Sequence, residues 1–139
     1  MELFRAMQKG TNGVPICGTG DLMLGARVPI DVRPDADGKV WPGRGGMSVT
    51  PGDPRRLPTH LRPEGLEKGT GRLPVFAIDL DALELFLAFR PDAKKPDKHG
   101  YVEPHGPMML DDFQATLFRT APHWREYRCE VRLLDIGNS

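Results

Sequence analysis

The chain has 139 residues, which is enough for one domain with a hydrophobic core of its own, and we predict a single domain over residues 1–139. Its 19 basic and 19 acidic residues balance, whereas a general nucleic-acid-binding protein usually carries a basic excess. No apolar run approaches the ~20 residues of a membrane span. The first ten residues, MELFRAMQKG, lack the features of a cleavable signal peptide. We therefore expect no membrane association and a cytoplasmic site of action, in the producing cell or in a target cell reached by secretion without a signal peptide.

The first half of the chain predicts one strand followed by a long irregular region. Residues 3–7, LFRAM, are apolar around a single arginine and indicate a strand. Residues 10–74 hold most of the glycines and prolines, but they show no repeat and include apolar anchors such as Val28 and Met47. We predict short strands joined by turns and long loops there, with glycine and proline fixing the backbone angles.

The next segments predict a strand, a helical turn and a second strand. Residues 73–80, LPVFAIDL, indicate an apolar strand, and Asp81 is the expected N-cap of the single turn that follows it. Residues 85–90, LFLAFR, fit either an extension of that turn or another strand. Residues 101–103 predict a short strand.

The C-terminal part predicts the main helix and a last strand. The helix is expected over residues 109–120, where Met109, Phe113 and Leu117 share one face. Residues 126–134 alternate between apolar and charged types, which is typical of a strand with one solvent-exposed face. Together these elements predict a compact α+β domain or a decorated β-barrel.

Several common functional motifs do not occur. The sequence contains neither the GxGxxG motif of dinucleotide-binding folds nor the P-loop motif, and it lacks the HExxH and GxSxG signatures. Rossmann-type and P-loop nucleotide binding are therefore not expected.

The richest group of chemically active side chains lies just before the predicted helix: His99, Tyr101, Glu103 and His105. Two histidines and a carboxylate are a ligand set that zinc accepts. The glycines and prolines between them predict a turn equally well, and we predict no metal site.

Two further places are candidates for ligand binding. Arg5 is the only charge within its apolar strand, and its planar guanidinium suits a phosphate or a carboxylate, although a structural ion pair would satisfy it as well. Ser48 and Thr50 follow two glycines, and strand alternation places both hydroxyls on one face. They could bind a ribose or a phosphate, or simply face solvent at a sheet edge.

A local basic excess marks residues 39–68, which contain six basic residues against three acidic ones. This segment could bind a pyrophosphate, an RNA backbone or an acidic protein, or it could be an ordinary solvated loop.

Taken in order, these pieces resemble the small type VI secretion effector toxins that have an ADP-ribosyltransferase-like fold. The resemblance rests on Leu3-Phe4-Arg5-Ala6, on Gly46-Met47-Ser48-Val49, and on His99, Tyr101, Val102, Pro104 and Pro107-Met108 followed by a helix that ends near Trp124. Each piece is short, but the order and approximate spacing span most of the chain.

The resemblance implies a compact split, mixed β-sheet core with long Gly/Pro-rich loops, one main C-terminal helix, and NAD bound between the two halves. It implies transfer of ADP-ribose from NAD to an acceptor macromolecule that the sequence does not identify, and neutralisation by a cognate immunity protein. In this interpretation Arg5, Ser48 and Thr50 bind NAD. Glu103, His99 and Tyr101 are the candidate catalytic residues, although the Gln-x-Glu or Glu-x-Glu motif of ADP-ribosyltransferases is absent.

Two other functions remain open from the sequence. One is a non-enzymatic, β-rich module that binds RNA or a protein through the basic residues 39–68. The other is a phosphotransfer or nuclease domain in which His60, His99 or His105 acts as general acid–base. The transferase interpretation predicts that Arg5→Ala and Glu103→Ala keep the fold and lose toxicity.

Overall fold

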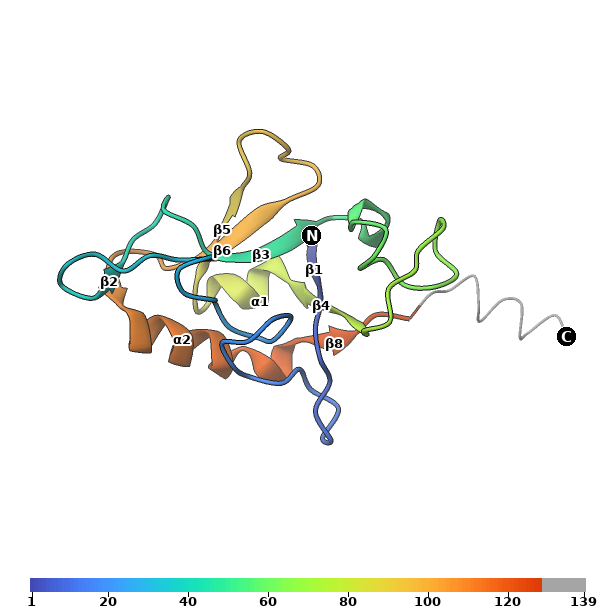
Figure 1. Ribbon diagram of the computed structural model, residues 1–139, viewed down its shortest axis with the longest axis horizontal. Helices are drawn as coiled ribbons and strands as arrows, with labels where there is room; N and C mark the ends of the chain where they lie inside the picture. Colours follow the sequence, from blue (N-terminus) through green and yellow to red (C-terminus); the bar gives the residue numbers. More distant parts are fainter. Residues whose placement is uncertain (129–139) are drawn as a thin grey trace, which may run out of the picture.

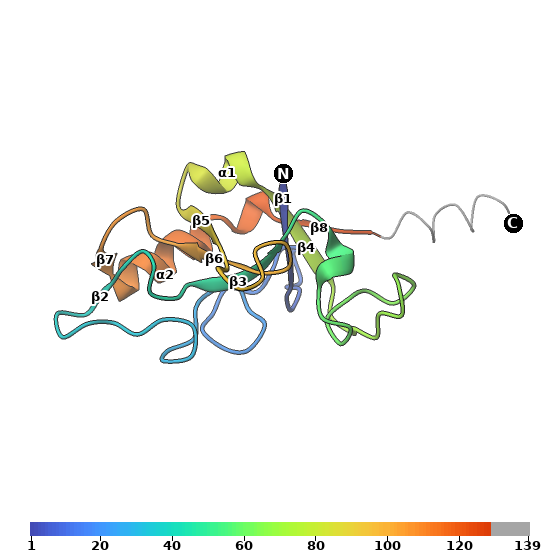
Figure 2. The same ribbon diagram turned by 90° about the horizontal axis from the view of Figure 1, so that it is seen from above.

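A central sheet and one main helix make up most of the regular structure. The computed structural model describes residues 1–128. Its six-stranded sheet has the order β5–β6–β3–β1–β4–β8, with the bounds β1 Glu2–Ala6, β3 Met47–Pro51, β4 Val75–Asp79, β5 Ala88–Pro91, β6 Gly100–Glu103 and β8 Arg125–Glu126. A separate pair, β2 (Lys39–Val40) and β7 (Met108–Met109), lies at the opposite end of the molecule from the loops that follow β3 (Figures 1 and 2). The protein is thus a small α+β protein, as predicted.

Neighbouring strands of the six-stranded sheet pair in antiparallel fashion. The expected mixed sheet is wrong in this respect, because no parallel pair joins two of these strands within the described residues. Direct hairpin connections, such as the one between β5 and β6, can join only antiparallel neighbours.

β3 connects the two halves of the sheet, because its two ends pair with different strands. Its C-terminal end pairs with Leu3 and Phe4 of β1, whereas its residues 47–49 pair with β6. β1 and β3 therefore separate beyond Phe4, and Arg5 lies at this point of divergence. We call this place the sheet split.

The sheet is covered on both faces at β1. Leu3 and Met7 pack into the main core, together with Phe113 of the helix, while Phe4 and Ala6 pack into a smaller core on the other face. A strand buried on both faces needs apolar residues at consecutive positions, which explains the continuous apolar run around Arg5.

The main helix, α2 (Leu110–Arg119), confirms the prediction over residues 109–120. Phe113 and Leu117 are fully buried on its inner face. Met109 does not share that face, because it is the N-cap residue, belongs to β7, and is 45% exposed. No helix within residues 1–128 is long and apolar enough to cross a membrane.

The short helix α1 (Leu80–Glu84) begins earlier than predicted. Its N-cap is Asp79, whose side chain makes no capping hydrogen bond, and Asp81 lies inside the first turn. The backbone N–H of Leu80 donates to the Met1 carbonyl at 2.9 Å, so pairing with β1 continues up to the residue at which the helix begins.

The remaining predictions were partly correct. Residues 85–90 resolve into the end of the α1 turn followed by a strand, β5. The strand predicted over residues 126–134 is wrong for residues 127 and 128, because β8 ends at Glu126, and residues 129–134 lie outside the described residues.

The long segment between β1 and β2 is attached to the helix by one buried side chain. The Gln114 amide accepts a hydrogen bond from the Ala26 N–H at 2.9 Å and donates one to the Ala26 carbonyl at 2.6 Å. Both residues are buried, with Ala26 fully inaccessible. This pair of bonds positions residues 21–31, which form one side of the site described below.

We expect Gln114→Ala to lower the free energy of unfolding by about 2–4 kcal/mol, because it leaves the buried N–H and carbonyl of Ala26 without partners. Gln114→Glu should also destabilise, since a carboxylate accepts from the N–H but repels the carbonyl. Denaturant unfolding measures both changes, and exposed Ala115→Ser on the same helix is the control. A change below about 0.5 kcal/mol for Gln114→Ala would contradict this role.

Candidate functional site

A pocket of about 400 Å³ opens at the sheet split. Its walls come from β1 and β3, from residues 21–27, from residues 57–61, and from the residue before β6. The polar residues of its lining are Arg5, Asp21, Arg27, Ser48, Thr50, His60 and His99. The structure therefore brings together four of the six site residues predicted from the sequence.

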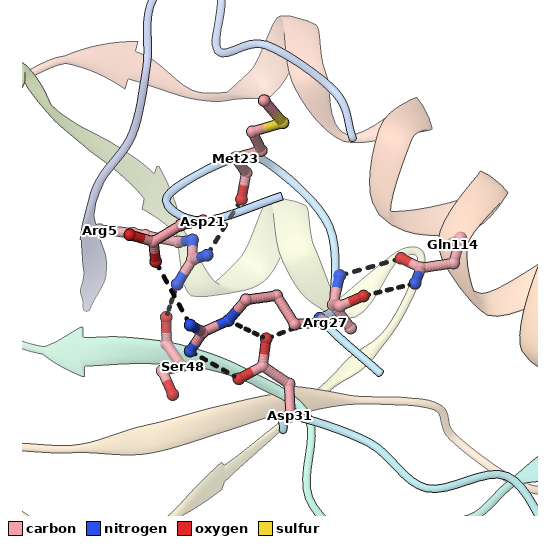
Figure 3. Close-up of polar contacts among 8 residues, drawn as sticks. Arg5, Asp21, Met23, Arg27, Asp31, Ser48 and Gln114 are labelled. Carbon is pink, nitrogen blue, oxygen red and sulfur yellow. Dashed lines mark hydrogen bonds and ion pairs between the residues drawn. The ribbon is translucent and has the colours of Figure 1, made fainter. Parts of the chain in front are cut away.

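Arg5 fills the gap that opens where the two strands diverge. Its two terminal nitrogens donate to the carbonyl oxygens of Ser48, at 2.9 Å, and Met23, at 3.0 Å (Figure 3). The side chain is only 8% exposed, and its Nε is buried without a hydrogen-bond partner among the described residues. Burial lowers the pKa of Arg5 to about 10, since desolvation disfavours the charged form.

A second guanidinium in the wall of the pocket, that of Arg27, points toward Arg5 (Figure 3). Arg27 forms ion pairs with Asp31 and Asp21, each at 3.3 Å. The hydrogen bond to Asp31 raises the pKa of Arg27 above its ordinary value. The two carboxylates are thus bonded to Arg27, and Arg5 has no carboxylate partner within ion-pair distance among the described residues.

Ser48 and Thr50 lie on the same face of β3, as alternation predicted, and both line the pocket. Neither hydroxyl makes a hydrogen bond to another described residue; Ser48 is half-buried and Thr50 is only 4% exposed. Ser48 also contributes its backbone carbonyl, which accepts a hydrogen bond from Arg5.

The three predicted catalytic residues form one chain of contacts rather than one cluster. Glu103 accepts a hydrogen bond from Arg90 Nε at 2.9 Å, and the Arg90 guanidinium lies 4.6 Å from the centre of the Tyr101 ring. The Tyr101 and His99 rings pack edge-on with their centres 4.7 Å apart. His99 Nδ1 lies 2.9 Å from the Asp92 carboxylate. His99 lines the pocket, whereas Glu103 is at the far end of this chain and does not.

Glu103 is bound within the protein. It is 4% exposed, and besides the Arg90 ion pair it accepts a hydrogen bond from the Gly43 N–H. A carboxylate with these partners supports neighbouring side chains but has little access to a ligand in the pocket.

Three contributors to the site were not predicted as binding or catalytic residues: Arg27, Asp92 and Leu22. His60, which also lines the pocket, was a candidate only in the phosphotransfer or nuclease alternative. No local pattern distinguishes Arg27 or Asp92, because their roles depend on contacts made after folding. Leu22 adopts a positive φ of 52°, which is uncommon for a non-glycine residue. Leu22 and His60 also line a second, adjoining pocket of about 300 Å³.

The structure places the other histidine of the predicted group outside the pocket. His105 is exposed and its Nε2 lies 3.2 Å from the Glu84 carbonyl oxygen. Within residues 1–128 no group of three or more His, Cys, Asp or Glu side chains could hold a metal ion.

The basic residues of segment 39–68 are dispersed, and several are bonded within the protein. Arg55 pairs with Asp53 and Glu67, and Arg56 and Arg62 donate to backbone carbonyl oxygens. The ion pairs of Arg55 reduce the net charge that the segment can offer to a polyanion, whereas Arg56 and Arg62 keep their charges.

Comparison with protein-family models, curated proteins and solved structures finds no match to this chain. The function is therefore argued from the geometry of the site.

Proposed function

We propose that the protein is an NAD-dependent toxin domain with an ADP-ribosyltransferase-like fold, and that it binds NAD in the pocket at the sheet split. The observation that carries this proposal is Arg5, a buried cation with an unpartnered Nε, in a pocket that also presents free hydroxyls. A buried charge is costly unless it is paired, so a pocket built around one favours an anionic ligand.

The pocket offers suitable groups for the two chemical parts of NAD that carry most of its polar atoms. Arg5 suits the pyrophosphate, because it brings a guanidinium charge that no carboxylate neutralises, whereas Arg27 is already paired with Asp21 and Asp31 and contributes less. Ser48 and Thr50 suit the hydroxyls of the ribose or the nicotinamide amide. His99 lies at the wall where an acceptor would approach.

In this proposal the protein transfers ADP-ribose with release of nicotinamide, and it acts in the cytoplasm of a target cell. A cognate immunity protein would protect the producing cell, and the acceptor is a macromolecule still to be identified. The alternative of an RNA- or protein-binding module through residues 39–68 has less support, since the charge of Arg55 is already paired with Asp53 and Glu67.

We expect isothermal titration calorimetry to show that the wild-type protein binds NAD with a Kd well below about 1 mM. Ser48→Ala should weaken binding about tenfold, because a hydrogen bond to a charged or strongly polar group contributes ~1.5 kcal/mol. Thr50→Val should weaken it to a similar extent.

Exposed Thr11→Ala, which lies outside the pocket, is the matched control and should bind as the wild type does. Absence of heat with both NAD and ADP-ribose in the wild type would overturn the proposal. Unchanged affinity in a Ser48→Ala/Thr50→Val variant would show that any NAD binding occurs elsewhere.

A further inference from the structure

Asp92 and His99 are joined by two hydrogen bonds where the strands of the β5–β6 hairpin meet its loop. The Asp92 carboxylate lies 2.9 Å from His99 Nδ1, and the Asp92 backbone N–H donates to the His99 carbonyl, also at 2.9 Å. The other carboxylate oxygen accepts from the Lys94 N–H at 2.9 Å, so the orientation of the carboxylate is fixed. The hydrogen bond to His99 is the main reason that the pKa of Asp92 lies below its ordinary value. Asp92 is therefore an anion at neutral pH.

The His99 ring is held on its other side as well. The Tyr101 ring meets it edge-on, and Tyr101 is in turn covered by the guanidinium of Arg90. Because Nδ1 is bonded to Asp92, Nε2 is the nitrogen that remains, and it has no partner among residues 1–128. His99 is also one of the residues that line the pocket at the sheet split.

An anionic acceptor at Nδ1 favours the neutral imidazole in which Nδ1 carries the proton and Nε2 carries the lone pair. An imidazole in this state, in the wall of a pocket, can take a proton from a nucleophile that binds there. A carboxylate that orients a histidine through Nδ1 serves the same purpose in the catalytic triads of hydrolases.

We propose that Asp92 is a positioning residue that holds His99 in the Nδ1–H form, and that His99 Nε2 is the general base that activates the acceptor. The proposal rests on the proposed function. It assigns proton transfer to the Asp92–His99 dyad, and it assigns to Glu103 the support of the dyad through Arg90 and Tyr101.

The reaction balances without an oxidant or reductant. The bond between ribose C1 and the nicotinamide nitrogen breaks, and its electron pair leaves with nicotinamide, which departs as a neutral molecule. The acceptor oxygen or nitrogen forms a new bond to C1 with its lone pair, and its proton passes to His99 Nε2 and then to solvent. The dyad therefore suits acceptors that lose a proton on attack, such as a hydroxyl, an amide or water.

The first test is independent of catalysis. Nitrogen-15 NMR distinguishes the two neutral imidazole forms through the chemical shifts of Nδ1 and Nε2. We expect His99 of the wild type to be in the Nδ1–H form and Asp92→Ala to shift it toward the Nε2–H form. Exposed His60 is the internal reference, and Asp97→Ala in the same hairpin loop is the matched control. An unchanged His99 tautomer in Asp92→Ala would overturn the dyad.

The second test measures nicotinamide release from NAD with water as the acceptor. We expect Asp92→Ala, Asp92→Asn and His99→Ala each to lower kcat by about 10²-fold or more, with KM within about threefold of wild type, since positioned general bases typically contribute that much. Asp97→Ala should keep the wild-type rate. A kcat within about threefold of wild type in Asp92→Ala would overturn the positioning role.

Failure of this proposal is distinguishable from failure of the proposed function. If the wild type binds no NAD and releases no nicotinamide, then the proposed function and the catalytic role of the dyad fall together, and the tautomer measurement still decides whether the dyad exists. If NAD binds in the pocket and is turned over equally by all of the variants, then only the dyad's role is overturned.

Discussion

Arg5→Met is expected to abolish NAD binding while leaving a folded protein, and Arg5→Ala is expected to lose both binding and stability. We expect the largest effects at Arg5, because its charge is buried beside the pocket and its two terminal nitrogens bridge the Ser48 and Met23 carbonyl oxygens. Arg5→Ala leaves these two oxygens unpaired and opens a cavity, so we expect a loss of about 3 kcal/mol in the free energy of unfolding.

Arg5→Met should lose less stability than Arg5→Ala, for two reasons. The methionine fills much of the same volume, and the protein no longer has to bury a charge. The pKa of about 10 shows the sign of this second effect: protonation is harder in the folded state than in the unfolded chain, so below about pH 10 the charge itself costs stability. An anionic ligand would offset that cost. We therefore expect Arg5→Met, which removes the charge, to remove NAD binding as well.

The measurements are denaturant unfolding for stability and calorimetry with NAD for binding, with exposed Arg33→Met as the matched control. A folded Arg5→Met protein that binds NAD with wild-type affinity would show that the Arg5 charge does not bind the ligand. Equal destabilisation by methionine and alanine would instead point to the two carbonyl bonds as the main role of Arg5. The earlier expectation from the sequence, that Arg5→Ala keeps the fold intact, does not take these bonds into account.

The sequence predicted those parts of the fold that depend on neighbouring residues. The α2 helix follows from the spacing of Phe113 and Leu117, and β1 and β4 follow from short apolar runs. Alternation along β3 was enough to place the Ser48 and Thr50 hydroxyls on one face. Met109 shows the limit of this reasoning, because its apolar side chain fits the helical period but the chain at that point pairs with β2.

The parts of the site that could not be predicted depend on pairs distant in the sequence. Arg5 faces the carbonyls of Met23 and Ser48 only because β1 and β3 separate after Phe4, and nothing local to LFRAM indicates such a split. The ion pair between Arg90 and Glu103 likewise depends on the register of the β5–β6 hairpin, which places Ala88 opposite Glu103 and Arg90 opposite Tyr101. Composition and periodicity contain no information on either register.

Glu103→Gln is expected to retain most of the turnover of NAD, within about tenfold of wild type, even though Glu103 is the only carboxylate of the predicted catalytic group. Its oxygens are bonded to Arg90 and to the Gly43 N–H, and the side chain is 6% exposed. Glutamine can keep a bond to one of these partners. Glu103→Ala keeps neither, and we expect it to lower the free energy of unfolding by about 2–3 kcal/mol; this is less than a fully buried ion pair would cost, since Arg90 is about one-third exposed.

Arg90→Ala separates the supporting role of Glu103 from a catalytic one. If Glu103 acts through Arg90 and Tyr101, then Arg90→Ala and Glu103→Ala should lower the rate of nicotinamide release by similar factors, and the double variant should add little to either. If Glu103 instead stabilises the positive charge that develops on the ribose, Glu103→Gln should lower kcat by 10²-fold or more at unchanged stability. In that case Arg90→Ala, which frees the carboxylate, should retain turnover. The comparison of the Glu103→Gln and Arg90→Ala rates therefore decides between the two roles. If Glu103 is catalytic, Glu103→Gln is the slower variant, because the carboxylate has lost its charge. If Glu103 is supporting, Arg90→Ala is the slower variant, because the carboxylate has lost its partner.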